Sequence, residues 1–181
     1  MIDKTKVVTG VVKLSYVNVW QPKCVNGVEK YSVSIIVDKK DQNTLGNIGV
    51  AVNAAIEEGV KKFPDFVTDK SLLKLPLRDG DEMMEDVYKD KYFINASSII
   101  QPQIVDRKLK FILNHDEVYS GVLARVSIRL FPFHKGGSMG VGCGLLNIQK
   151  VADGDRLIGI RSTPQDDFTI LDEDFDDDFL D

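Results

Sequence analysis

A run of alternating side chains between residues 122 and 133 constrains the fold more than any other stretch of this sequence. Because successive side chains of a β-strand point to opposite faces, such a run predicts a strand with one face on a core and the other toward solvent. The apolar even positions are Val122, Ala124, Val126, Ile128 and Leu130, and the odd positions are Arg125, Ser127, Arg129, Phe131 and Phe133.

A second alternating arm follows a glycine-rich turn at residues 134–138, so the stretch 118–151 is predicted to form a β-hairpin. Glycine at positions 140, 142 and 144 alternates here with Val141, Cys143 and Leu145. Glycine weakens a strand, and three glycines on one face indicate close approach by a ligand or by another backbone segment.

The outer face of this hairpin combines guanidinium groups with flat rings. That combination suits single-stranded nucleic acid, because cations neutralise phosphates while rings stack on bases. The same residues also fit a plain solvated face whose Arg and Phe side chains only make cross-strand pairs. The pattern alone leaves both interpretations open.

Three further segments alternate and predict additional strands. Residues 6–20 are rich in Val, and their second face is only half polar, which is typical of a strand that bends through a barrel. Residues 30–37 place Tyr31, Val33, Ile35 and Val37 inward. Residues 91–98 place Tyr92, Ile94 and Ala96 on one face and Lys91, Phe93, Asn95 and Ser97 on the other.

The period changes between residues 41 and 63, where apolar residues recur at spacings of three and four. This spacing predicts an amphipathic helix with Asp41 or Asn43 as its N-cap and Pro64 beyond its end. Residues 64–90 are loop-like and leave room for a hidden strand. Residues 104–113 predict a short β-ribbon or a loop excursion.

About five β-segments and one substantial helix predict a mainly β protein, an OB-fold-like five-stranded barrel over residues 1–163. Closure of a barrel removes exposed sheet edges, and a β-sandwich is the main alternative. One feature departs from the usual OB arrangement, in which the helix follows the third strand. Here the helix lies between the second and the third strong strands.

Acidic residues are concentrated at the C-terminal end of the 181-residue chain. Residues 166–181 hold nine acids and no Lys or Arg, which leaves 23 basic and 19 acidic residues for positions 1–165. The net charge of −5 therefore hides a body of about +4. Residues 164–181 cannot bury a core and are expected to form a disordered acidic tail.

Several other classes of protein find little support. The sequence has no apolar run long enough to span a membrane and no signal peptide, so no membrane partner is expected. Cys24 and Cys143 lie in no Cys-x-x-Cys pair, and no cofactor or zinc site is predicted. The acids around Asp81 could hold a divalent metal in a nuclease, but Asp79-Gly80-Asp81 is foremost turn chemistry.

Six phrases, in order over nearly the whole chain, resemble those of a family of phage single-stranded-DNA-binding proteins. They are residues 14–22 (LSYVNVWQP), 30–36 (KYSVSII), 76–81 (PLRDGD), 92–96 (YFINA), 118–121 (VYSG) and 142–150 (GCGLLNIQK). The resemblance implies an OB fold with an acidic tail and binding without catalysis in the host cell cytoplasm. Such tails often finish on phenylalanine, whereas this chain ends Phe179-Leu180-Asp181.

Alternation and side-chain chemistry then select the candidate DNA contacts. The aromatic candidates are Trp20, Phe93, Tyr119, Phe131 and Phe133, and the cationic ones are Lys13, Lys30, Arg78, Lys91, Arg125 and Arg129. Ser32, Asn95 and Ser127 could add hydrogen bonds to phosphates. For Trp20, a core position that closes the barrel is an equal alternative.

The predicted function is to coat and protect single-stranded DNA, without sequence preference, during phage DNA replication, recombination or repair. The tail is expected to compete with DNA and to recruit phage or host replication and recombination proteins, although it could also only solubilise the protein. Its candidate residues are Phe168, Asp174, Phe175, Asp176, Asp177, Asp178 and Phe179. The alternatives are a structural or assembly protein of the virion and, with less support, a metal-dependent nuclease.

Overall fold

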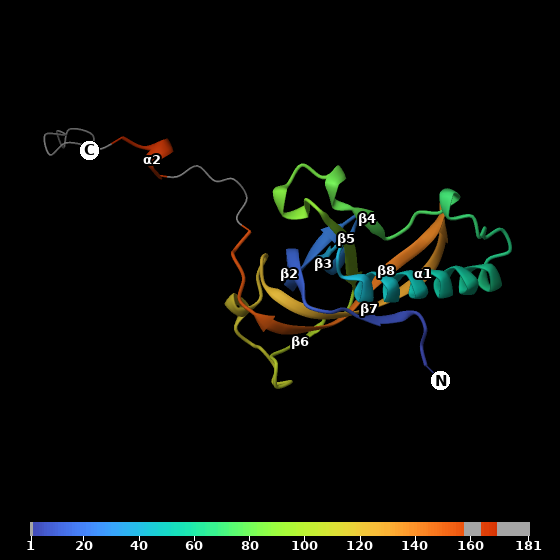
Figure 1. Ribbon diagram of the computed structural model, residues 1–181, viewed down its shortest axis with the longest axis horizontal. Coiled ribbons are helices and arrows are strands. Elements are labelled where there is room, and N and C mark those ends of the chain that lie inside the picture. Colours follow the sequence, from blue (N-terminus) through green and yellow to red (C-terminus); the bar gives the residue numbers. More distant parts are fainter. Residues whose placement is uncertain (1, 158–163, 170–181) are drawn as a thin grey trace, which may run out of the picture.

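The computed structural model describes residues 2–157 and 164–169. Eight strands form one sheet with a long helix beside it (Figure 1). The strands are β1 Lys6–Val8, β2 Val12–Val25, β3 Val28–Asp38, β4 Leu77–Asp79, β5 Lys91–Ser98, β6 Gln103–Val105, β7 Leu123–Lys135 and β8 Ser138–Ala152. The α-helices are α1 Gln42–Lys62 and the single turn α2 Pro164–Asp167, which lies in the segment expected to be disordered.

Five of these strands close into a ring in the order β7, β2, β3, β5, β8 and back to β7. All pairs in the ring are antiparallel except β5 with β8, which is parallel. The ring has two short seams, because β5 and β8 share the pair Ser97 and Gly144, while β2 and β7 pair only through Val12 and Lys13. This order confirms the predicted OB-like, mainly β fold.

The alternation predicted for the hairpin is confirmed in β7, whose even positions from 124 to 130 are all buried. Together with β2, β3, β5 and β8 they form one apolar core. The hairpin turns at Gly136 and Gly137, which both have positive φ as a tight two-residue turn requires. The same device joins β2 to β3 at Asn26 and Gly27.

The first predicted strand, residues 6–20, is wrong in two respects. It is broken into β1 and β2, and β2 continues to Val25, beyond the predicted end at residue 20. Tyr16 has a φ of 46° at a register shift between Ser15 and Asn18. This bulge reverses the alternation, so Tyr16 is exposed instead of sharing the inner face with Leu14.

Helix α1 begins and ends as predicted. The Asp41 carboxylate accepts a hydrogen bond from the Thr44 amide at 3.0 Å and caps the first turn, and Pro64 follows the last one. Its apolar stripe, which includes Ile48 and Ala55, packs mainly against β7 and β1. The helix therefore covers the ring on the side of β7 and β1. In the chain it lies between β3 and β5, which is the departure from the usual OB order that the sequence indicates.

The predicted loop 64–90 contains the short strand β4, which pairs with β5. Residues 80–90 then fold over the outer face of β3 and β5, and we call them the covering segment. Tyr88 from this segment packs with Ile36 and Phe93 in a second, smaller apolar cluster. Its hydroxyl lies 3.3 Å from that of Ser34, and the two rings of Tyr88 and Phe93 meet edge to face with centroids 5.0 Å apart. One outer face of the sheet is thus buried.

Candidate nucleic-acid interface

A second outer face, on β7 and β8, carries five of the polar and aromatic side chains that the sequence singles out. Cross-strand pairs set its rows: Arg125 with Gln149, Ser127 with Asn147, Arg129 with Gly144, Phe131 with Gly142 and Phe133 with Gly140. We call these ten residues the β7–β8 face. Arg125, Arg129 and Phe131 are exposed, while Phe133 is half-buried.

Phe131 lies on a floor made by glycine. A Cβ atom added at Gly142 would come within 2.5 Å of the Phe131 ring, so only glycine leaves room for it. Phe131 nevertheless keeps 43% of its surface exposed. At Gly140 the close neighbour is the backbone of Lys74, which forms a bridge with this strand. The close approach indicated by the glycines is therefore made by the chain itself at two of the three positions.

Arg129 is held at the edge of this face by the N-terminal segment. Its Nη2 atom lies 2.7 Å from the Asp3 carboxylate, and both side chains are about half exposed. Hydrogen bonds from Thr5, and then the guanidinium of Arg129, lower the pKa of Asp3, so this carboxylate is ionised at neutral pH. Lys6 pairs with Arg129 across β1 and adds a second cation to the same edge.

Arg125 lies at a hollow of about 280 Å³ on the same face. Its Nε atom donates to the Thr9 carbonyl at 3.2 Å, which fixes the direction of the guanidinium. The walls combine amide side chains, among them Gln103, Asn147 and Gln149, with the apolar Val8 and Leu109. Such a hollow is large enough for a nucleobase and offers donors and acceptors for its edge.

A row of small polar positions continues from this face across the β5–β8 seam. Gly144 pairs with Ser97, and Ser97 pairs with Ser32 on β3. Ser32 is among the predicted contacts, whereas Ser97 is not predictable as one, because its proximity to Gly144 arises from a parallel pairing between distant segments. Small side chains here leave the backbone accessible to an extended ligand.

Three predicted contacts, Phe93, Arg78 and Lys91, lie instead near the covering segment. Phe93 is only 3% exposed, so its assignment as a stacking residue is wrong: Tyr88 and Ile36 bury the ring, and the Arg78 guanidinium lies 5.3 Å from its centroid. Lys91 pairs with Asp38 at 2.6 Å. Lys13 and Lys30 lie on β2 and β3, outside the β7–β8 face.

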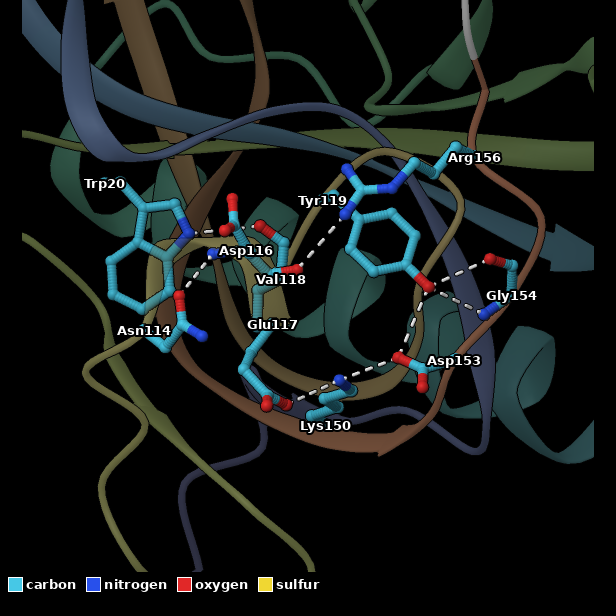
Figure 2. Close-up of polar contacts among 10 residues, drawn as sticks. All are labelled: Trp20, Asn114, Asp116, Glu117, Val118, Tyr119, Lys150, Asp153, Gly154 and Arg156. Atoms are coloured by element: carbon cyan, nitrogen blue, oxygen red, sulfur yellow. Dashed lines mark hydrogen bonds and ion pairs between the residues drawn. The ribbon is translucent and has the colours of Figure 1, made fainter.

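Trp20 and Tyr119 lie in a third place, beside the end of β8 (Figure 2). Trp20 packs against the core, stacks on His115 at 4.4 Å and donates from Nε1 to the Val118 carbonyl at 3.0 Å. Tyr119 also packs against the core, and the Arg156 guanidinium covers its ring at 4.1 Å. Both rings are engaged within the protein, which favours the structural interpretation of Trp20.

The acids once considered for a metal site have structural roles. Lys39 Nζ lies 2.8 Å from Asp79 and 2.5 Å from Asp81, and these carboxylates accept backbone hydrogen bonds from Asp81 and Asp90. The pKa of each carboxyl is lowered, first by the Lys39 ammonium. Within residues 2–157 and 164–169 no cluster of His, Cys, Asp or Glu could hold a metal ion.

Most of the predicted tail residues lie outside the described part of the chain. These are Asp174, Phe175, Asp176, Asp177, Asp178 and Phe179. Phe168 is described and is 75% exposed. None of the helices that the structure describes is long and apolar enough to cross a membrane.

A family profile described as "Enterobacter phage Enc34, ssDNA-binding protein" matches residues 5–180. The chain belongs to this family. Its members are binding proteins rather than enzymes. The match covers the whole ring, the β7–β8 face and nearly all of the tail. A comparison with curated protein sequences finds no match.

Solved structures of phage proteins share the fold. The single-stranded DNA-binding protein from bacteriophage Enc34 superposes with a TM-score of 0.73 at 17% identity, covering 91% of this chain and 90% of that one. The same protein in complex with ssDNA gives 0.70 at 19% identity, with 86% and 90% covered. Gp2.5, a single-stranded DNA-binding protein encoded by bacteriophage T7, gives 0.62 at 14% identity, with 90% and 100% covered.

Proposed function

We propose that this protein binds single-stranded DNA without sequence preference and that the β7–β8 face is its main contact surface. The observation that carries the proposal is a row of side chains along β7. The hollow at Arg125 comes first, the Arg129 guanidinium follows four residues later, and the exposed Phe131 ring two residues after that. Cations in such a row neutralise successive phosphates, and the ring stacks on a base. Family membership supports the same ligand.

In the infected cell, this activity would coat and protect single-stranded DNA during phage replication, recombination or repair. Residues 1–163 form the binding domain in this proposal, and residues 164–181 form an acidic tail that competes with DNA and recruits replication or recombination proteins. The support for the tail's role is its charge, since nine acids are joined to a body of about +4.

The first test compares random-sequence single-stranded and duplex DNA in a gel-shift assay, with and without magnesium. Single strands should bind more tightly, and affinity should fall steeply as salt rises, because binding releases counterions from the phosphates. Equal affinity for both forms, or no binding, would favour a structural role in the virion. Magnesium-dependent loss of the DNA would favour a nuclease.

A second test removes the two guanidinium groups. Arg125→Ala with Arg129→Ala should weaken binding to all sequences equally and flatten the dependence of affinity on salt. Lys61→Ala with Lys62→Ala, at the exposed end of α1, is a control that removes the same charge elsewhere. If the folded Arg variant binds like the parent while the parent binds single strands, the DNA site lies on another face.

A further inference from the structure

A basic and apolar ribbon projects from the sheet edge beside the β7–β8 face. After β6 the chain turns at residues 106–110 and returns, so that Phe111 forms a bridge with Val105. The Asp106 carboxylate holds the turn by accepting hydrogen bonds from the amides of Lys108 and Lys110 at 2.7 and 3.0 Å. The backbone of this ribbon is thus well defined, and its side chains are available for contact.

Those side chains form an unusual surface. Leu109, Phe111 and Leu113 are 71%, 66% and 84% exposed. The cations Arg107, Lys108 and Lys110 lie between and beside them, and none of the three forms an ion pair within the described residues. Exposed apolar groups that gather in one place mark an interaction site, and the cations indicate that its partner is acidic.

One side of the ribbon opens into a groove of about 590 Å³, which we call the ribbon groove. Its walls are residues 106–108 and 110–114 together with Glu117, Lys150 and Val151. Its two acids are already engaged, because Glu117 pairs with Lys150 at 2.7 Å and Asp106 caps the turn. The groove therefore offers positive charge and apolar surface to a ligand.

Residues 153–157, which precede the tail in the chain, lie next to this groove. The Tyr119 hydroxyl bonds to both the carbonyl and the amide of Gly154, at 2.9 and 3.1 Å, and the Leu157 amide donates to the Ser120 carbonyl at 2.9 Å. Lys150 adds an ion pair with Asp153 at 2.8 Å (Figure 2). A hollow at this point shares Asn114, Glu117 and Lys150 with the ribbon groove. Residues 153–157 are thus fixed at one end of the groove.

The chemistry of the tail complements that of the groove. Residues 172–181 read DEDFDDDFLD, with seven acids around Phe175, Phe179 and Leu180. Phe175 follows Leu157 by 18 residues, and a chain of that length spans at most roughly 60 Å. A tether this short gives an effective concentration on the order of millimolar. At that effective concentration, weak contacts are sufficient to hold the tethered segment in the groove.

We propose that residues 172–181 dock in the ribbon groove of the same molecule. Phe175 and Phe179 pack on Phe111 and Leu113, while the acids pair with Arg107, Lys108 and Lys110. This docking rests on the proposed function, in which the tail competes with DNA, and it places the tail close to the DNA. Gln103, Val105 and Leu109 of the same ribbon line the Arg125 hollow, so a docked tail places negative charge beside the DNA path.

The test uses amide resonances of the full-length protein at low salt. Phe175→Ser with Phe179→Ser should shift the resonances of residues 106–114 to the positions that they have after deletion of 166–181. Phe168→Ser, which changes a phenylalanine outside the docking segment, should leave them in place. Shifts on the β7–β8 face alone, or no shifts, would overturn the proposal.

The reciprocal variant changes the groove. Lys108→Glu with Lys110→Glu should release the tail, so that its own resonances match those of the protein in 0.5 M salt, whereas Lys61→Glu with Lys62→Glu should not. If the resonances of residues 106–114 in the parent protein stay unchanged at every dilution, the tail docks within one molecule. If the shifts vanish on dilution, the groove binds the tail of a second copy, which would overturn the proposal. Single-stranded-DNA binding of the parent, measured separately, decides the proposed function independently.

Discussion

The outer face of β3 and β5 and the outer face of β7 and β8 have similar sequences, but the first is covered and the second is open to solvent. Both present an aromatic ring within a strand of alternating side chains, Phe93 in one and Phe131 in the other. The covering segment buries Phe93 to 3% exposure, while Phe131 keeps 43%. Alternation thus identifies the face that packs on the core, but a distant segment decides whether the opposite face is open to a ligand.

The largest effect expected from this difference is on stability. Phe93→Ala should lower the free energy of unfolding by about 3–5 kcal/mol, because it removes a buried ring from the second cluster. Phe131→Ala should cost far less stability and should instead weaken single-stranded-DNA binding by about 1–3 kcal/mol, the contribution of one stacked base. Urea unfolding and DNA titration of both variants measure the two quantities.

A glycine of β8, Gly142, sets the position of the Phe131 ring. Gly142→Ala should push the ring off its floor and lower DNA affinity by about 1 kcal/mol, the lower end of the stacking range. Gly49→Ala, on α1, is the control, since its new Cβ would meet no atom within 4 Å. Equal affinities for the two variants would show that the position of the Phe131 ring is irrelevant to binding.

The smallest expected effect concerns the attachment of the covering segment. The Tyr16 hydroxyl, on β2, donates a hydrogen bond to the Glu85 carboxylate, and this bond raises the pKa of Tyr16 to about 12. A raised pKa means that the bond stabilises the fold below about pH 10, the ordinary tyrosine value, and that this contribution is lost as the pH rises through 12.

Tyr16→Phe should therefore remove the step near pH 12 from the tyrosine absorbance titration. It should also reduce stability at pH 8 more than at pH 12. Tyr92→Phe, on β5, is a control that removes a different hydroxyl. If the parent and the Tyr16 variant titrate alike, the covering segment is attached by its apolar contacts alone.

The ring, the helix and the hairpin were predictable because each follows from a local period that the core imposes. The inward residues of β7 and the Asp41 cap are examples. The bulge at Tyr16 was not, since a positive φ in a strand leaves no sign in the residue type. Of the site, Arg125, Arg129 and Phe131 follow from alternation. The burial of Phe93 depends on Tyr88, which arrives from a loop whose path no period predicts.

The ion pair between Asp3 and Arg129 makes the N-terminal segment a counterion that the protein carries with it. A phosphate that binds Arg129 displaces this carboxylate, whereas a phosphate at an unpaired cation displaces none, and in both cases cations are released from the DNA. The exchange at Arg129 leaves the local charge nearly unchanged and frees the first residues of the chain. DNA occupancy would then be reported at the N-terminus, and a probe attached before Thr5 would detect it without touching the DNA.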